Sequence, residues 1–294
     1  MTKAPRVLVV GDVMTDYVAL MEGPVAIGSD RRARIYARPG GSAATQAVWM
    51  ARFGLDVDFV GRVGAPDIAV ETERLRAAGV TPHLAADFER ETGRLIALVD
   101  PSGERSFLTD KGANAGLTEA DIPDELIAAA DHLHLSGYAF FEPGPRAAVQ
   151  AAMRKASGKS IAIDPASAEF LREAGAAVFL KWTGGAQMLF PNAEEAAVLS
   201  GSDDPQQQGE RLAAHFELVV IKRGAEGCEA YSGERRWRAP APRVAVVDTT
   251  GAGDAFAAGF LAARLSGAAM EECLARAVAS GSEATQFPGG RPPA

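Results

Sequence analysis

Short apolar runs alternate along this chain with segments that have the periodicity of amphipathic helices. The apolar runs lie at residues 6–10, 57–60, 132–135, 160–163, 188–190 and 218–221. Between the first two, Ala44, Ala47, Val48 and Ala51 recur at positions i, i+3, i+4 and i+7, the spacing of one helix face. Alternating strands and helices form a parallel sheet covered by helices, and strands buried on both faces are apolar almost throughout. The sequence therefore predicts an α/β fold whose central, mainly parallel sheet is flanked by helices.

Two stretches, residues 13–38 and 83–110, interrupt this alternation with β-prone residues and no helical periodicity. Within the second, residues 93–99 and 105–109 flank a turn at 100–103, which predicts an antiparallel hairpin. No Gly-, Ser- or Pro-rich linker separates either stretch from the rest. We therefore expect residues 1–294 to form a single domain with a small β-sheet lid.

Composition and charge exclude several other kinds of protein. The formal net charge of −8 and the lack of a concentrated basic patch argue against a nucleic-acid partner. No apolar run approaches the ~18 residues that span a membrane, so no membrane partner is expected either. The two cysteines, Cys228 and Cys273, are too few for a disulfide framework, which indicates a reducing, cytoplasmic environment.

The strongest chemical signal lies at residues 246–260. A strand is expected to end at Val247, a glycine-rich turn follows, and a helix begins near Gly253. The backbone N–H groups of residues 251–253 would then point outward at a positive helix N-terminus, where a phosphate binds. Asp254 places a carboxylate beside this cradle, where it would repel the ligand unless it has a task, and general base is the obvious one. The alternative is that Asp254 only complements the helix dipole.

Residues 248–260 resemble the C-terminal signature of the ribokinase-like (PfkB) family of carbohydrate kinases along the whole motif. Residues 40–47, 111–118, 192–195 and 221–227 are similar to further family motifs, in the same order. The resemblance covers essentially the whole chain. It implies an α/β fold with a β-sheet lid, ATP and Mg²⁺ as co-substrates, and phosphorylation of a hydroxyl of a sugar or sugar-containing small molecule. The roles it implies are Asp254 as general base, Gly251, Ala252 and Gly253 as anion hole, and Asn192 and Glu195 ordering Mg²⁺ through its waters.

The same resemblance indicates where the substrate binds. Asp16 matches the family position that hydrogen-bonds sugar hydroxyls, and a carboxylate accepts two hydroxyl protons with charge-assisted strength. Asp12, just after the first strand, either joins it or caps a turn. Gly40 and Gly41 open a helix whose N-terminus can meet the substrate. Glu142 falls where the family often places a substrate contact, and an ordinary surface glutamate is the alternative.

Three positions depart from the ribokinases proper. Ser42 stands where those enzymes have Lys, and Thr45 and Met14 stand where they have Asn. Thr45 stays a candidate substrate contact, whereas a thioether accepts hydrogen bonds only feebly. Each buried hydrogen bond lost costs about 1–3 kcal/mol. We therefore expect free ribose to be a poor substrate compared with a different sugar.

For the nucleotide, the resemblance indicates the turn after the strand at 218–221. Lys222 follows this strand, and Gly224 and Gly227 shape a turn over which an adenosine can lie; a solvated lysine is the alternative for Lys222. Asp248 and Thr250 resemble the positions where many family members bind a monovalent cation. K⁺ binding and an ordinary loop contact are the two alternatives there.

Other functions and sites are weighed against this interpretation. A nucleoside kinase and a non-catalytic sugar or nucleotide sensor on the same scaffold stay open, whereas residues 11–14 lack the Gly-x-Gly-x-x-Gly fingerprint of a dehydrogenase. The open edges of a small lid predict a homodimer in which two chains cover each other's lids. His132 and His134, without a third ligand at metal spacing, are expected to be satisfied core histidines, and Cys228 a buried thiol.

Overall fold

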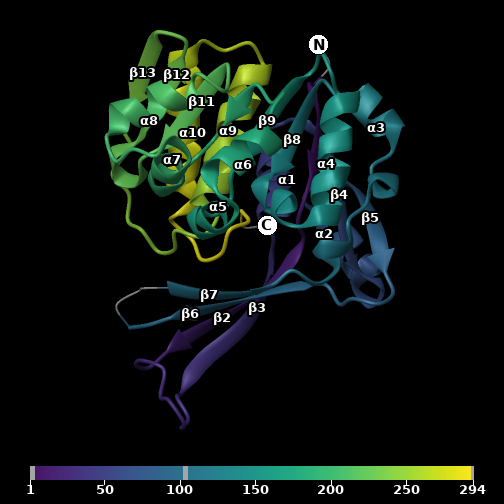
Figure 1. Ribbon diagram of the computed structural model, residues 1–294. Helices are drawn as coiled ribbons and strands as arrows, with labels where there is room; N and C mark the ends of the chain where they lie inside the picture. Colours follow the sequence, from purple (N-terminus) through teal and green to yellow (C-terminus); the bar gives the residue numbers. More distant parts are fainter. Residues whose placement is uncertain (1–3, 102–104, 293–294) are drawn as a thin grey trace.

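The computed structural model describes residues 4–101 and 105–292, whose strands form a large and a small sheet (Figure 1). In these ranges the large sheet has nine strands, in the order β13-β12-β11-β10-β9-β8-β1-β4-β5. They are β1 (Arg6–Val10), β4 (Asp56–Gly64), β5 (Thr81–Asp87), β8 (His132–Ser136), β9 (Ser160–Asp164), β10 (Met188–Leu189), β11 (Leu218–Lys222), β12 (Cys228–Ser232) and β13 (Arg235–Ala239). Every pairing from β11 to β5 is parallel, and the β12–β13 hairpin adds antiparallel pairings at one edge. The predicted α/β fold class is confirmed.

Helices cover both faces of the large sheet. On one face lie α1 (Ser42–Arg52), α2 (Ile68–Ala77), α9 (Ala252–Leu265) and α10 (Met270–Ala284). On the other lie α3 (Asp124–Ala129), α4 (Pro143–Lys155), α5 (Ala168–Ala174), α6 (Ala176–Trp182), α7 (Ala193–Ser200) and α8 (Pro205–Leu212). Val7 and Val9 of β1 enter the core on the α1 side, while Leu8 and Val10 enter the other core. Because both faces are buried, such strands are apolar without alternation. In the described part of the chain, no helix is long and apolar enough to cross a membrane.

The small sheet, which we call the lid, extends away from the body (Figure 1). Its strands are β3 (Ala33–Gly40), β2 (Met14–Met21), β6 (Gly93–Val99) and β7 (Arg105–Asp110), paired in that order. β6 and β7 are antiparallel, as the hairpin prediction requires. Residues 102 and 103 of the expected turn lie outside the described residues.

The structure differs from the expectations in three places. Residues 83–87 belong to β5, which pairs with β4 in the large sheet, so the second part of the lid begins at Gly93. β5 was missed because an edge strand is half exposed and lacks a continuous apolar run. No strand ends at Val247, which is 61% exposed and whose N–H donates to the Thr285 carbonyl. Finally, Thr118 and Asp121, three residues apart, predict a capped helix over residues 122–130, but their capping box opens a 3₁₀ turn and α3 begins only after Pro123.

Candidate active site

A cavity of about 980 Å³ lies where the lid meets the carboxyl ends of the parallel strands. Ligands of α/β sheets bind at this edge. The predicted site residues that line it are Asp12, Asp16, Gly40, Gly41, Thr45, Glu142, Asn192, Glu195, Lys222, Thr250, Gly251, Gly253 and Asp254. Ala252, Asp248, Gly224 and Gly227 do not line it. The structure therefore gathers most of the candidate residues, drawn from both ends of the chain, around one cavity.

The turn before α9 has the geometry expected of an anion site. Gly251 caps the helix with φ 72°, and a Cβ there would lie 2.4 Å from Gly290 Cα, so only glycine fits. The first N–H groups of a helix lack intrahelical partners and carry partial positive charge. The Ala252 N–H donates a hydrogen bond to the Thr249 carbonyl at 3.3 Å. A Cβ on Gly253 would lie 3.3 Å from Lys222 Nζ, so a lysine adds a full positive charge beside this turn.

Asp254 lies in the first turn of α9, partly buried, and lines the cavity. Its Oδ1 accepts hydrogen bonds from Ser42 Oγ at 2.7 Å and from Gln46 Nε2 at 3.0 Å. Burial and, to a lesser extent, the charge of Asp164 raise the pKa of this carboxyl to about 8, although the Ser42 hydrogen bond and Lys222 act in the opposite direction. A carboxylate with such a pKa binds a proton far more tightly than an ordinary aspartate.

Lys222, at the end of β11, is a partly buried cation that lines the cavity, and not a solvated lysine. Its Nζ forms an ion pair with Asp164 Oδ2 at 2.7 Å. Burial lowers its pKa, but Asp164 and Glu195 raise it by more, so it stays charged. Asn192 and Glu195 form a capping box at the start of α7, with Asn192 Oδ1 accepting from the Glu195 N–H at 2.9 Å and Glu195 Oε2 from the Asn192 N–H at 2.8 Å. Burial raises the pKa of Glu195 to about 7.

Asp16 projects from the lid strand β2 toward the helix α1 end of the cavity. A Cβ on Gly40 would lie only 2.1 Å from Asp16 Oδ1, so this glycine makes room for the carboxylate. Burial raises the pKa of Asp16 to about 6, Asp12 adds to the rise, and Arg291 opposes it. Thr45, on α1, is buried at the same end. Asp16 is thus placed to accept hydrogen bonds from a ligand.

Asp12 is held by the protein itself. Its Oδ2 accepts from the Ser42 N–H at 2.7 Å, and its Oδ1 accepts from Ser136 Oγ at 2.8 Å and the Ala43 N–H at 3.3 Å. A Cβ on Gly41 would lie 2.5 Å from the Asp12 carbonyl oxygen, and its φ of 88° also favours glycine. These contacts correspond to the capping alternative, since they satisfy the first N–H groups of α1.

Glu142 lies on the cavity wall with a cation beside it. Its Oε1 is 3.3 Å from Lys111 Nζ, and that ammonium lies 5.0 Å from the centre of the Phe170 ring. The pair joins the start of α4 to the segment that leaves the lid. Lys111 therefore links lid and body next to the site.

The turn after Lys222 follows the predicted shape but is not part of the cavity wall. Gly224 and Gly227 have φ of 56° and 99°. A Cβ on Gly227 would lie 2.0 Å from the Ala239 carbonyl oxygen, which explains this glycine by close packing against β13. Around Gly224 a Cβ would meet nothing within 4 Å.

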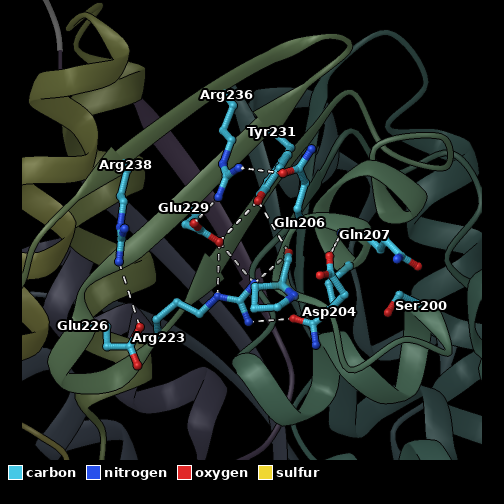
Figure 2. Close-up of polar contacts among 12 residues, drawn as sticks. Ser200, Asp204, Gln206, Gln207, Arg223, Glu226, Glu229, Tyr231, Arg236 and Arg238 are labelled. Atoms are coloured by element: carbon cyan, nitrogen blue, oxygen red, sulfur yellow. Dashed lines mark hydrogen bonds and ion pairs between the residues drawn. The ribbon is translucent and has the colours of Figure 1, made fainter.

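A polar cluster at the sheet edge braces this turn, and Figure 2 shows its side chains converging on Glu229. The buried Glu229 carboxylate lies 3.2 Å from Arg223 Nη2 and 2.6 Å from Arg236 Nη2, and it accepts from the Tyr231 hydroxyl at 3.2 Å. Arg223 also donates to Gln208 of α8 at 2.6 Å. The cluster ties β11, β12, β13 and α8 together.

Residues 289–291 return to the cavity, which Gly290 lines. The Gly289 N–H donates to Asp248 Oδ2 at 3.0 Å, and Arg291 Nη2 donates to the Gly40 carbonyl at 2.9 Å. The Gly290 carbonyl accepts from Trp49 Nε1 at 2.8 Å. Asp248 Oδ1 accepts from the Thr250 N–H at 2.8 Å, so Asp248 joins the tail to the turn before α9.

Sequence comparison decides the family. The model of the pfkB family carbohydrate kinases matches residues 4–294. The chain belongs to this family. It is 32% identical over 286 residues to the ATP-dependent ribose-1-phosphate kinase of Halopiger xanaduensis, an alignment covering 94% of this chain and 90% of that protein.

Further relatives of this pfkB family kinase differ in the substrate that their names state. A fructokinase of Klebsiella pneumoniae is 31% identical over 273 residues, covering 87% of this chain and 83% of that protein. The crystal structure of adenosine kinase from Sinorhizobium meliloti has a TM-score of 0.90 at 26% identity, covering 99% of this chain and 97% of that one. The predicted enzyme class, a carbohydrate kinase, is confirmed.

Several residues of the kinase site were not singled out from the sequence. Asp164 had a usable signal, because it directly follows an apolar strand at the ligand-binding edge. Gln46 lies one helical turn after Ser42 within a recognised motif, but its partner Asp254 is 208 positions away. The tail contact through Gly290 had no local signal. The expectation of satisfied core histidines is wrong for His132, whose ring nitrogens have no hydrogen-bond partner among the described residues.

Proposed function

We propose that this chain transfers a phosphoryl group from ATP to a hydroxyl of a sugar or sugar-containing small molecule. The observation that carries the proposal is the Asp254 carboxylate, which lines the cavity from the first turn of α9, directly after the glycines at the helix N-terminus. Phosphoryl transfer to an alcohol needs a group that accepts the hydroxyl proton and positive groups that stabilise the transferring phosphoryl. Asp254 and the preceding turn offer both within four residues of chain.

In this proposal, different residues of the chain accept the proton, stabilise the phosphoryl charge and bind the acceptor. Asp254 accepts the proton of the acceptor hydroxyl as its oxygen attacks phosphorus. The N–H groups of Gly251 and Gly253, with Lys222 beside them, stabilise the negative charge on the phosphoryl oxygens, whereas the N–H of Ala252, the third expected donor, is hydrogen-bonded to the Thr249 carbonyl. Asp16 holds the acceptor by its other hydroxyls.

Asn192 and Glu195, which also line the cavity, fit a hydrated divalent cation. ATP supplies the phosphoryl group, and Mg²⁺ neutralises its charge when both are bound. Asp164 raises the pKa of both Glu195 and Asp254, a crowding of carboxylates that a cation would relieve. Among residues 4–101 and 105–292, no group of three or more His, Cys, Asp or Glu is arranged to bind a metal directly. Asn192 and Glu195 would therefore hold the ion through its waters.

The rest of the nucleotide would lie beyond Lys222, over the open side of the Gly224–Gly227 turn. K⁺ near Asp248 and Thr250 is the remaining part of the proposal. Asp248 already ties Thr250 to Gly289, so a cation there would act by stiffening the turn before α9. Turnover that is equal in K⁺ and in tetramethylammonium salts would exclude it. Both cysteines are buried and unpaired, which fits the expected reducing compartment.

A nucleoside is the second candidate acceptor. Met14, Leu95 and Phe107 add apolar surface to the cavity that also contains Asp16, and such surface suits a base attached to the sugar. A solved relative is an adenosine kinase. The non-catalytic sensor predicts nucleotide or sugar binding without ADP release.

One experiment tests the function and separates these alternatives. ADP release is measured with Mg·ATP and a panel that includes ribose, fructose, ribose 1-phosphate and adenosine, for the wild type and Asp254→Asn. We expect turnover with one acceptor and a loss of about 10²- to 10⁴-fold in the variant. A variant that retains most of its turnover would exclude Asp254 as base, and a wild type that binds ATP yet releases no ADP with any acceptor would favour the sensor.

We also propose that two chains pair through their lids. Ile35, Ile96 and Leu108 are 66%, 40% and 58% exposed, and the strand register places them on the face opposite Asp16 and Leu95. Burying such a face against a second copy removes apolar surface from water. Light scattering at micromolar concentration should give twice the chain mass, and Leu108→Glu should give a monomer; a wild-type monomer would refute the dimer.

A further inference from the structure

Both hydrogen bonds that the structure gives the Asp254 carboxylate converge on one oxygen. Oδ1 accepts from Ser42 Oγ and from Gln46 Nε2, two donors one turn apart on α1. Since α1 holds this edge of the carboxylate, Oδ2 is the oxygen left to accept the proton of an acceptor hydroxyl. The orientation of the carboxylate therefore depends on α1.

Gln46 can serve in this way only with its amide in one orientation. In the ionised form that acts as base, the Asp254 carboxylate only accepts hydrogen bonds, so in that form the amide nitrogen must face it. If the amide were rotated by 180°, Gln46 Oε1 would face Asp254 Oδ1, and these two acceptors would repel each other. Gln46 is fully buried, so no bulk water holds its carbonyl.

His134, on the central strand β8, supplies the missing partner. Its Nε2 lies 2.6 Å from Gln46 Oε1. Burial lowers the pKa of His134 well below its usual value, and His132 and Lys222 lower it further, so the ring is neutral. A neutral imidazole carries one proton, and the contact with a carbonyl oxygen places that proton on Nε2.

We propose that His134 and Gln46 are positioning residues for the catalytic base: His134 holds the Gln46 amide, and Gln46 holds Asp254 Oδ1 so that Oδ2 faces the acceptor. The proposal rests on the proposed function, because it requires Asp254 to be the base. Neither His134 nor Gln46 lines the cavity, so both act through Asp254.

His132 provides a matched control. It is fully buried, lies two residues earlier on the same face of β8, and its ring centre is 6.4 Å from that of His134. Within the described ranges neither of its ring nitrogens has a hydrogen-bond partner. Replacing either histidine removes a similar ring from the same core, but only His134 contacts Gln46.

The experiment compares His134→Met, His134→Gln and His132→Met by ADP release with the acceptor that the wild type uses fastest. Methionine fills much of the ring volume without an N–H, whereas the glutamine amide can present an N–H near the position of Nε2. We expect kcat to fall about 10-fold or more in His134→Met, because small displacements of a reacting group are costly. KM for ATP should stay within about twofold. His134→Gln should recover most of kcat, and His132→Met should keep kcat within about twofold.

The pH profile provides a second readout that a packing defect would not move. Loss of an oriented N–H donor destabilises the Asp254 carboxylate, so the acidic limb of kcat/KM should move to higher pH in His134→Met only. The charged and titratable groups around Asp254, which are Asp12, Tyr138, Asp164 and Lys222, are the same in every variant.

Equal kcat losses in His134→Met and His132→Met, with unchanged pH profiles, would overturn the proposal. The Asp254→Asn variant distinguishes failure of this proposal from failure of the proposed function. If Asp254→Asn is inactive while His134→Met and His132→Met have equal kcat, Asp254 is the base but the contacts through Gln46 and His134 do not position it. Melting curves check folding. If His134→Met does not fold, Gln46→Met replaces it with the same expected loss, and a Gln46→Met enzyme with wild-type kcat and pH profile would refute the role.

Discussion

Replacing Asp254 by Asn should stabilise the folded chain, by an amount that grows with pH up to about 8. Burial raises the pKa of this carboxyl from its ordinary 3.8 to about 8. In the unfolded chain the carboxyl loses its proton near pH 4, while in the folded chain it keeps the proton until about 8. Between these values the unfolded state binds fewer protons, so the free energy of unfolding of the wild type falls as pH rises. Asparagine has no charge to bury and does not show this fall.

The size of the effect follows from the same pKa. One pH unit in this window changes the free energy of unfolding by about 1.4 kcal/mol, so from pH 5 to pH 7 the variant should gain about 2–3 kcal/mol relative to the wild type. For a chain of this length that is about 4 °C in Tm. The asparagine Oδ1 can still accept from Ser42 and Gln46, so no hydrogen bond of the site offsets the gain.

The assay is thermal unfolding of both proteins at pH 5, 6, 7 and 8, followed by circular dichroism. Glu234→Gln, on the exposed turn between β12 and β13, is the control for removing a carboxylate without burial. The difference in Tm between Asp254→Asn and wild type should widen from pH 5 to pH 8, while the control difference stays flat. A difference for Asp254→Asn that is constant or shrinks over this range would refute the buried, proton-binding state of Asp254.

Three shorter predictions test other parts of the structure. Gly251→Ala places a Cβ against the Gly290 backbone at a positive φ, so kcat should fall at least about 10-fold with about 1–3 kcal/mol of lost stability; normal turnover would contradict the anion-hole geometry. Glu229→Leu strands two arginines at the sheet edge and should lower the free energy of unfolding by about 3 kcal/mol in urea titrations, with kcat unchanged; a kcat loss at full stability would instead link the cluster to catalysis. Ribose should be a poor acceptor for the wild type, and Met14→Asn should raise its kcat/KM; a wild-type KM for ribose below 1 mM would contradict this.

The strands that the sequence predicted are those buried on both faces. β1, β4, β8, β9, β10 and β11 each contain one of the short, mostly apolar runs recognised in the sequence. The edge strands β5 and β13 were not predicted as strands of the large sheet, because an exposed face admits polar residues such as Arg235 and Arg236. At Val246 and Val247 the sequence predicted a strand that the structure does not have. β-branched residues alone do not form a strand, and the edge of the large sheet is occupied by β13.

The site was predictable where its chemistry is local. The glycines before α9, Asp254 and the Asn192–Glu195 box each act within a few residues of their motif. The donors that hold Asp254 come from 208 and 212 positions away, and such contacts leave no trace in local periodicity. Whether Asp12 contacts the substrate or caps a turn could not be decided from the sequence, because its partners Ser136 and the N-terminus of α1 are brought to it only by the fold.

The contacts of residues 289–291 also bear on the order in which the enzyme is assembled. Gly290 packs against the anion-binding turn, and Arg291 is hydrogen-bonded to Gly40 at the start of the site, so these last described residues complete a pocket whose first wall is made at residue 12. During synthesis on the ribosome, the pocket therefore stays unfinished until residue 291 has left the exit tunnel. A nascent chain that already contains Asp254 but not residues 289–291 would still lack this wall.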